Sequence, residues 1–166
     1  MKIKNISEIN KNAFDMVGRD WMLISSGDEK ESNCMTASWG GFGVLWNKNV
    51  AFVFVRPVRH TYKFIESHDF FSLSFFNDAS RRILNYCGSN SGRDVNKIKE
   101  LSLHPVYYEN KTIIYEEADL TLICKKIYTD DLEPKFFKDK DIDKNYPEKD
   151  YHRMYIGEIS DILSKD

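Results

Sequence analysis

The sequence feature that most constrains the fold is the run VAFVFVR at residues 50–56. Its first six residues are apolar without alternation, which is typical of a strand buried on both faces. Pro57 ends the strand, because proline has no backbone N–H to donate to a neighbouring strand. We therefore expect a sheet that is covered on both sides around this segment.

Further strand signals surround this run, and only short helical segments separate them. Strands are predicted at residues 21–26, 33–39, 70–76 and 151–162, with two more within 107–128 around a turn at Asn110. Short helices are predicted at residues 6–17, 61–67, 80–86 and 94–99. Gly40 to Gly43 are expected to break or bend the strand before them, Gly88 to end a helix, and residues 130–150 to form loop or short helix. Because strands and helices do not alternate regularly, the expected fold class is mainly β, an antiparallel barrel with short peripheral helices.

Length, charge and residue spacing indicate how many domains to expect and which classes of partner and metal site are not indicated. A chain of 166 residues predicts a single domain, and a net charge of −2 gives no electrostatic reason to expect nucleic acid or an anionic membrane as partner. The three cysteines form no CxxC pair, and the four histidines show no metal-ligand spacing, so no metal site is predicted. The start of the chain lacks a signal peptide and no apolar stretch reaches the length of a membrane helix, so a cytoplasmic protein is expected.

The segment from Arg56 to Thr61 carries the most specific chemistry. Arg56, Arg59 and Thr61 follow the buried strand and enter a predicted helix. Two guanidinium groups, a hydroxyl and free helix amides are what a phosphate monoester requires. The alternative is that both arginines belong to an ordinary loop and that Thr61 caps the helix.

Two other segments are weaker candidates. Residues 33–41, NCMTASWGG, place small and hydroxyl side chains on a strand, which leaves room for a flat ligand against the backbone. The alternative is a barrel strand whose small residues fit a tight bend. Residues 88–97, GSNSGRDVNK, offer Arg93 and Lys97 beside a polar loop. The alternative there is a surface loop followed by a capped helix.

Together the motifs NCMTASWGGFG, VAFVFVRPVRHTYKFIE, YCGSNSGRDVNK and YIGEI resemble the flavin-reductase-like family of FMN-binding split barrels, and its flavoredoxin-type members in particular. The resemblance implies a six-stranded antiparallel Greek-key barrel over residues 1–166 and a homodimer with FMN at its interface. It implies that the cofactor is held by Met35, Thr36, Ala37, Ser38, Arg56, Arg59, Thr61, Ser91, Gly92 and Lys97. His152 and Tyr155, near the end of the chain, are weaker candidates to face the flavin. Asn96 departs from the acidic residue expected before the lysine.

The expected activity follows from this resemblance. FMN would accept a hydride at N5 from NADH or NADPH, with Lys97 as a candidate cation near N1 of the reduced ring. No GxGxxG motif is present, so the nicotinamide would bind without a Rossmann site. The alternative is an electron carrier that exchanges electrons with a redox partner protein. A third possibility is a similar barrel that holds another group, such as haem, although no axial ligand stands out.

Overall fold

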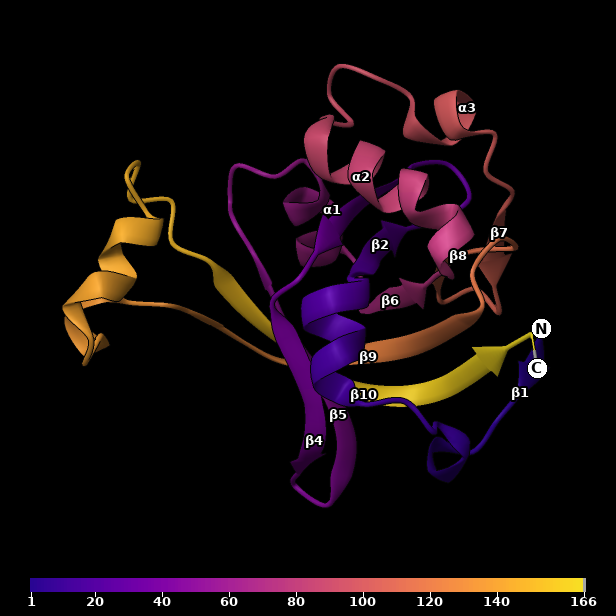
Figure 1. Cartoon of the computed structure of the whole chain (residues 1–166), viewed down its shortest axis with the longest axis horizontal. Helices are drawn as coiled ribbons and strands as arrows, with labels where there is room; N and C mark the ends of the chain where they lie inside the picture. The colour runs from indigo at the N-terminus through magenta and orange to yellow at the C-terminus, as the bar shows by residue number, and fades with distance from the viewer. Residues whose placement is uncertain (166) are drawn as a thin grey trace.

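The computed structural model describes residues 1–165, and its centre is an antiparallel barrel (Figure 1). Six strands supply the interior side chains: β2 (Met22–Gly27), β3 (Ser32–Ala37), β5 (Lys48–Val55), β6 (Phe70–Phe75), β9 (Leu120–Asp131) and β10 (Arg153–Ser164). With β4 (Gly40–Leu45), the spatial order is β3-β2-β6-β9-β10-β5-β4, and every pair is antiparallel. The expected mainly β, antiparallel barrel is confirmed.

The connections give the barrel its Greek-key order. Strands β5 and β6 are consecutive in the chain, yet β9 and β10 lie between them in the sheet. The chain makes this crossing through α1 (Thr61–Ser67), which has the predicted bounds. The segment after Pro57 is therefore carried across one end of the barrel, and this crossing brings Arg56 and Arg59 beside β3.

Side-chain alternation decides what faces the interior. On β5, Ala51, Val53 and Val55 point into the barrel and are fully buried. Phe52 and Phe54 point outward and are only half-buried. The prediction that this strand is buried on both faces is therefore wrong for the outer face, because no further layer of the described chain covers these two rings completely.

The remaining elements are short. They are β1 (Lys2–Ile3), which pairs with the end of β10, the hairpin of β7 (Pro105–Tyr108) and β8 (Thr112–Tyr115), α2 (Arg81–Ser89) and α3 (Lys97–Leu101). Single helical turns occur at Ile6–Glu8, Asp78–Ser80 and Pro134–Phe136, a two-turn 3-10 helix at Lys140–Asn145, and a wider helical segment at Asp15–Asp20. The sequence predicted one helix over residues 6–17, but the structure has two separate pieces.

Of the two glycine signals, one is confirmed and one is wrong. Strand β3 ends at Ala37 and Gly40 begins a new strand, β4, so the expected break is confirmed; the left-handed φ of 148° at Gly40 redirects the chain there. An added Cβ at Gly40 would lie 2.6 Å from the backbone oxygen of Phe52, so only glycine fits this approach. Gly88 lies inside α2 rather than after it.

Two features outside the barrel position the candidate site. Helix α2 and strand β8 pack on the outer face of β2 and β3, where a second hydrophobic cluster contains Leu23, Leu84 and Tyr115. Residues 132–152, here called the arm, leave β9 and return to β10, and Figure 1 shows them projecting away from the barrel.

Candidate functional site

A groove runs along the outer end of β3, with a volume of about 210 Å³. It is lined by Met35, Thr36, Ala37, Ser38, Trp39, Phe54, Arg56, Arg59 and His152. In the sheet formed by the described residues, β3 lies at one end and pairs with β2 alone. Its outer edge therefore presents backbone polar groups to the groove, as an unpaired strand edge does.

Small side chains keep this edge accessible. Met35 and Ala37 point into the barrel, so they contribute mainly backbone to the groove. Thr36 turns the other way and donates its hydroxyl to the carbonyl of Leu84 on α2. The strand thus fixes the distance between barrel and helix, while its backbone remains available to a ligand with a polar edge.

One end of the groove is aromatic. The rings of Trp39 and His152 lie 5.1 Å apart between centroids, and Phe54 lies 6.4 Å from His152. Burial, aided by the charge of Arg56, lowers the pKa of His152 to about 4, so the ring is neutral at pH 7. Its Nδ1 lies 2.9 Å from the hydroxyl of Tyr146 on the arm. This end provides flat apolar surface with no titrating cation.

The other end is cationic. Arg59 donates from Nη2 to the carbonyl of Gly88, at 3.2 Å. Burial and the neighbouring Arg56 both lower the pKa of Arg59, which reflects a positive group held near another positive group. An anion bound between these two guanidinium groups would offset their repulsion and stabilise the charged form of Arg59.

Arg56 also lines the groove, near both Arg59 and His152, and already has an acidic partner. Its Nη1 donates to both carboxylate oxygens of Asp150, at 2.8 and 3.0 Å, and its Nη2 donates to the carbonyl of Asn145. The guanidinium also lies 5.0 Å from the ring centroid of Tyr146. Arg56 therefore ties the arm to the groove, and the phosphate role expected of it stays a prediction.

Lys97 lies beside the groove rather than in its wall. Its amine is buried and donates to the carbonyls of Cys34, at 2.8 Å, and Cys87, at 3.1 Å. Burial lowers the pKa of Lys97. Arg59 and Lys97 thus donate hydrogen bonds to the carbonyls of two successive residues, Gly88 and Cys87, near the C-terminal end of α2. The C-terminal end of a helix attracts positive charge.

The role near the flavin ring that was expected of Lys97 stays a prediction. Lys97 does not line the groove, and it lies with Arg59 at the cationic end rather than among the aromatic side chains.

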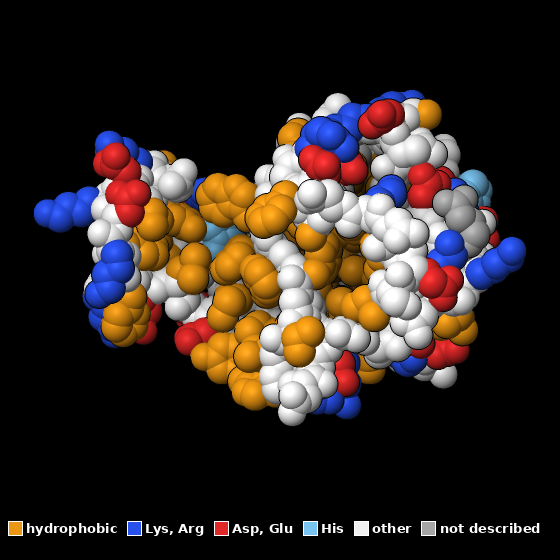
Figure 2. Space-filling view, turned by 60° about the horizontal axis from the view of Figure 1, so that its bottom comes forward, with side chains coloured by type: hydrophobic (Ala, Val, Ile, Leu, Met, Phe, Trp, Pro, Cys, Tyr) orange, Lys and Arg blue, Asp and Glu red, His pale blue; other side chains and the backbone are white. Residues whose placement is uncertain are grey.

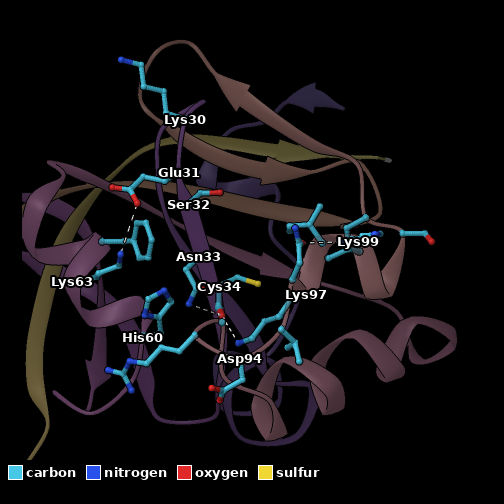
Figure 3. Close-up of a pocket in the computed structure, with 18 of the residues that line it drawn as sticks. Lys30, Glu31, Ser32, Asn33, Cys34, His60, Lys63, Asp94, Lys97 and Lys99 are labelled. Carbon is cyan, nitrogen blue, oxygen red and sulfur yellow. Dashed lines mark hydrogen bonds and ion pairs between the residues drawn. The ribbon is translucent and has the colours of Figure 1, made fainter.

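A second, larger cavity of about 820 Å³ lies on the far side of Lys97 (Figure 3). Gly92 and Asn33 belong to its wall, and an added Cβ at Gly92 would lie 2.0 Å from Oδ1 of Asn33. The amide of Asn33 in turn donates to the buried hydroxyl of Thr61, at 2.7 Å. Ser91 accepts from the backbone N–H of Arg93. These residues form the support behind the cationic end.

Thr61 and Tyr155 differ from expectation. The alternative interpretation of Thr61 as helix cap is wrong, because His60 occupies the cap position and Thr61 is the first residue of α1. Tyr155 was a candidate to face the flavin, but its ring points into the barrel and its hydroxyl donates to Glu66, at 2.8 Å. On an antiparallel strand, the inward position excludes it from the outer groove.

The structure thus brings six of the ten predicted residues into one groove, together with His152. Gly92 and Lys97 line the adjoining cavity, Thr61 touches it through Asn33, and Ser91 precedes Gly92. Sequence reasoning missed Trp39, Phe54 and Asp150. Trp39 stood within a quoted motif, and the outward register of β5 would have indicated Phe54.

Residues 1–165 contain no cluster of His, Cys, Asp or Glu arranged to hold a metal ion. Within the same span, no helix is both long and apolar enough to cross a membrane.

Known proteins resemble the chain over nearly its whole length. The family model described as flavin reductase like domain matches residues 15–166. Flavoredoxin from Methanosarcina acetivorans superposes with a TM-score of 0.69 at 25% identity, covering 98% of this chain and 76% of that one. An FMN-binding domain of a flavin reductases-like enzyme from Shewanella baltica OS155 gives a TM-score of 0.70 at 18% identity, with coverage of 98% and 76%.

An NADH:FAD oxidoreductase from Streptomyces globisporus C-1027, solved with NAD and FAD fragments, gives a TM-score of 0.65 at 14% identity and covers 87% of this chain and 74% of that one. A search of the curated proteins found no match.

Proposed function

The chain belongs to the flavin reductase like domain family, and from this premise we propose that it is an oxidoreductase that holds FMN in the groove along β3. The observation that carries the proposal is the polarity of that groove. Trp39, Phe54 and His152 form a flat apolar end, and Arg59 forms a cationic end, with the buried amine of Lys97 behind it. FMN has the same polarity, with a planar ring at one end and a phosphate at the other.

Each end has a separate task in this proposal. Arg59, supported by Lys97 and the carbonyls at the end of α2, would hold the phosphate through charge-assisted hydrogen bonds. The backbone of Met35 to Ser38 would meet the polar edge of the ring, and Trp39 and Phe54 would keep water from its face. Arg56 would orient the arm through Asp150.

FMN supplies the redox chemistry when it is bound, accepting a hydride at N5. The protein then needs to position and shield rather than to shuttle protons. The lowered pKa of His152, about 4, agrees with this, because a neutral buried imidazole is a poor proton donor at pH 7. We propose NADH or NADPH as the reductant, bound by stacking at the open aromatic end.

A second copy of the chain would complete the site. A groove of about 210 Å³ is small for a nucleotide, since ligand sites usually enclose roughly 300–1,000 Å³. Phe14, Trp39 and Phe136 are large apolar side chains exposed by 89%, 46% and 63%. Figure 2 shows hydrophobic side chains on the arm and on the facing part of the barrel, with a hollow between them. A homodimer that covers this face is therefore part of the proposal.

An electron-carrier function is the second candidate. The likeness to flavoredoxin from Methanosarcina acetivorans, at 25% identity, favours it. In that case FMN would occupy the same groove, and electrons would arrive from a redox partner protein instead of a nicotinamide.

The test begins with the absorption spectrum of the purified protein after loading with FMN, and with mass identification of the released cofactor. Stopped-flow reduction by NADH, by NADPH and by a reduced ferredoxin-like donor then separates the two functions. Fast reduction by a nicotinamide supports the reductase, and reduction by the protein donor alone supports the carrier. Failure to retain FMN at micromolar concentration contradicts both.

Light scattering tests the dimer independently. Phe136→Glu places a charge on the exposed apolar face of the arm, and Lys138→Glu is the matched control in the same segment. The first variant should shift the protein toward monomer and the second should not. A monomeric parent protein in the presence of FMN contradicts the proposed assembly.

A further inference from the structure

Two cysteines far apart in the sequence meet between β3 and α2. The sulfurs of Cys34 and Cys87 lie 3.7 Å apart, and both residues are buried as free thiols. They are separated by 53 positions in the chain. The flavin chemistry proposed above uses neither of them.

The surrounding backbone holds this pair in place. The amine of Lys97 donates to the carbonyls of both Cys34 and Cys87, so one side chain links the two residues (Figure 3 shows the bond to Cys34). Thr36, two residues along β3, bonds to the carbonyl of Leu84 on α2. The strand and the helix are thus fastened on both sides of the two sulfurs.

The remaining gap is small. A disulfide has a sulfur–sulfur distance of about 2.05 Å, so closing the gap from 3.7 Å requires each sulfur to move by about 0.8 Å. Side-chain rotation covers such a distance without separating β3 from α2. The third cysteine, Cys124, is also buried, but it lies in the barrel interior apart from this pair.

The two thiols also differ in reactivity. The hydrogen bond from Cys87, together with the charge of Lys97, lowers the pKa of Cys34. The proximity of Cys34 and burial raise the pKa of Cys87. One thiol is thus favoured as the thiolate nucleophile and the other as the thiol that attacks second. Cys34 also belongs to the wall of the cavity of about 820 Å³, which gives a small oxidant a route to this region.

We propose that Cys34 and Cys87 form a redox-active dithiol that hydrogen peroxide converts to a disulfide. The Cys34 thiolate attacks one peroxide oxygen, the O–O bond breaks, and the hydroxide that leaves takes up a proton to become water. The sulfur of Cys87 then attacks the sulfur of the sulfenic acid formed on Cys34. The S–S bond forms, the S–O bond breaks, and the hydroxyl group leaves as a second water with the proton of the Cys87 thiol. In total two thiols and one peroxide give one disulfide and two waters, so both sulfurs are oxidised and peroxide is reduced.

This modification would lock α2 onto β3 directly behind the cationic end of the groove. The reaction does not require bound flavin, so its test is independent of the proposed function. Peroxide is also what reduced flavins release on reoxidation in air, which would make the proposed cofactor a nearby source.

The experiment treats the full-length protein with a stoichiometric amount of hydrogen peroxide, without flavin. Remaining thiols are alkylated after denaturation, and the peptides are mapped by mass spectrometry without reduction. The expected result is a linked peptide pair containing Cys34 and Cys87, while Cys124 is alkylated in full. Dithiothreitol should restore alkylation of all three cysteines.

Cys87→Ser and Cys124→Ser are the matched variants. The first should abolish the linked pair and leave sulfenic acid on Cys34, which a dimedone-type probe detects, whereas the second should leave the linked pair unchanged. The parent protein alone decides the question if a variant fails to fold. Retention of three free thiols after peroxide treatment, oxidation of Cys124 in preference, or a link only between different molecules each overturns the proposal.

Discussion

The barrel interior and the layer between β3 and α2 are both buried, but they are built from different side chains. Interior positions such as Val53, Leu73 and Leu122 are aliphatic and need no hydrogen-bond partners. The outer layer buries the amine of Lys97 and the hydroxyl of Tyr115, and the latter has no hydrogen-bond partner of normal geometry. Burying polar groups costs stability unless they are satisfied. The interior is therefore stabilised by apolar packing alone, whereas the outer layer also needs hydrogen bonds, which Lys97 makes and the hydroxyl of Tyr115 lacks.

The largest effect should come from the interior. Leu73→Ala removes a fully buried side chain, and the free energy of unfolding should fall by about 2–5 kcal/mol. Chemical denaturation measures this change. FMN affinity of the folded variant should stay within about twofold of the parent, since Leu73 does not line the groove. A large loss of affinity without loss of stability would mean that Leu73 serves the groove rather than the stability of the barrel.

The next effect should come from the cationic end. Arg59→Ala should weaken FMN binding by about tenfold to a hundredfold, because a charge-assisted hydrogen bond contributes about 1.5–3 kcal/mol. Fluorescence titration of FMN measures the change. Arg93→Ala is the control, since the side chain of Arg93 is exposed and donates to the carbonyl of Val58. Equal losses in both variants would mean that general charge, rather than this site, holds the phosphate.

At the aromatic end, His152 should make the free energy of unfolding depend on pH. The pKa of His152, about 4 in the folded protein, is below its ordinary value of 6.5, so the unfolded chain takes up the proton first. The stability that the neutral His152 contributes to the fold is fully present above pH 6.5. It is lost as pH falls toward 4, and the free energy of unfolding then changes by at most about 1.4 kcal/mol per pH unit. Denaturation of the parent and of His152→Gln across this window measures the slope. An identical slope in the variant would contradict the assignment.

Among the arginines of the groove, the smaller effect on FMN binding should come from Arg56. Its charge is already paired with Asp150, so Arg56→Ala should change FMN affinity by no more than about threefold. Asp150→Asn frees the guanidinium and should bind FMN as well as the parent does, or better. If Arg56→Ala instead weakens FMN as strongly as Arg59→Ala, then the ion pair must open on binding and Arg56 joins the phosphate site.

Local patterns account for what the sequence predicted well. Helix α1 begins at Thr61 as expected, because the proline and the spaced apolar residues that define it are neighbours in the chain. Strand β3 was placed within two residues for the same reason. Met35 to Ser38, Arg56 and Arg59 then meet because the crossing after β5 returns the chain beside β3.

The contacts that could not be predicted join residues that are far apart in the sequence. The ion pair of Arg56 and Asp150 joins positions 94 residues apart, and nothing near either residue indicates the other. The contact of Cys34 with Cys87 spans 53 positions and needs the packing of α2 on β3. The outward direction of Phe54 depends on strand register, which a continuous apolar run does not disclose.

The open edge of β3 has a consequence for handling the protein. The outer edge of β3, which pairs with no strand of the described residues, offers its backbone to any extended segment, including the same strand of another molecule. A cofactor seated along it, and a second subunit covering it, would act as protection against such self-association. Preparations made under flavin starvation should therefore precipitate sooner on storage than those supplied with riboflavin during growth.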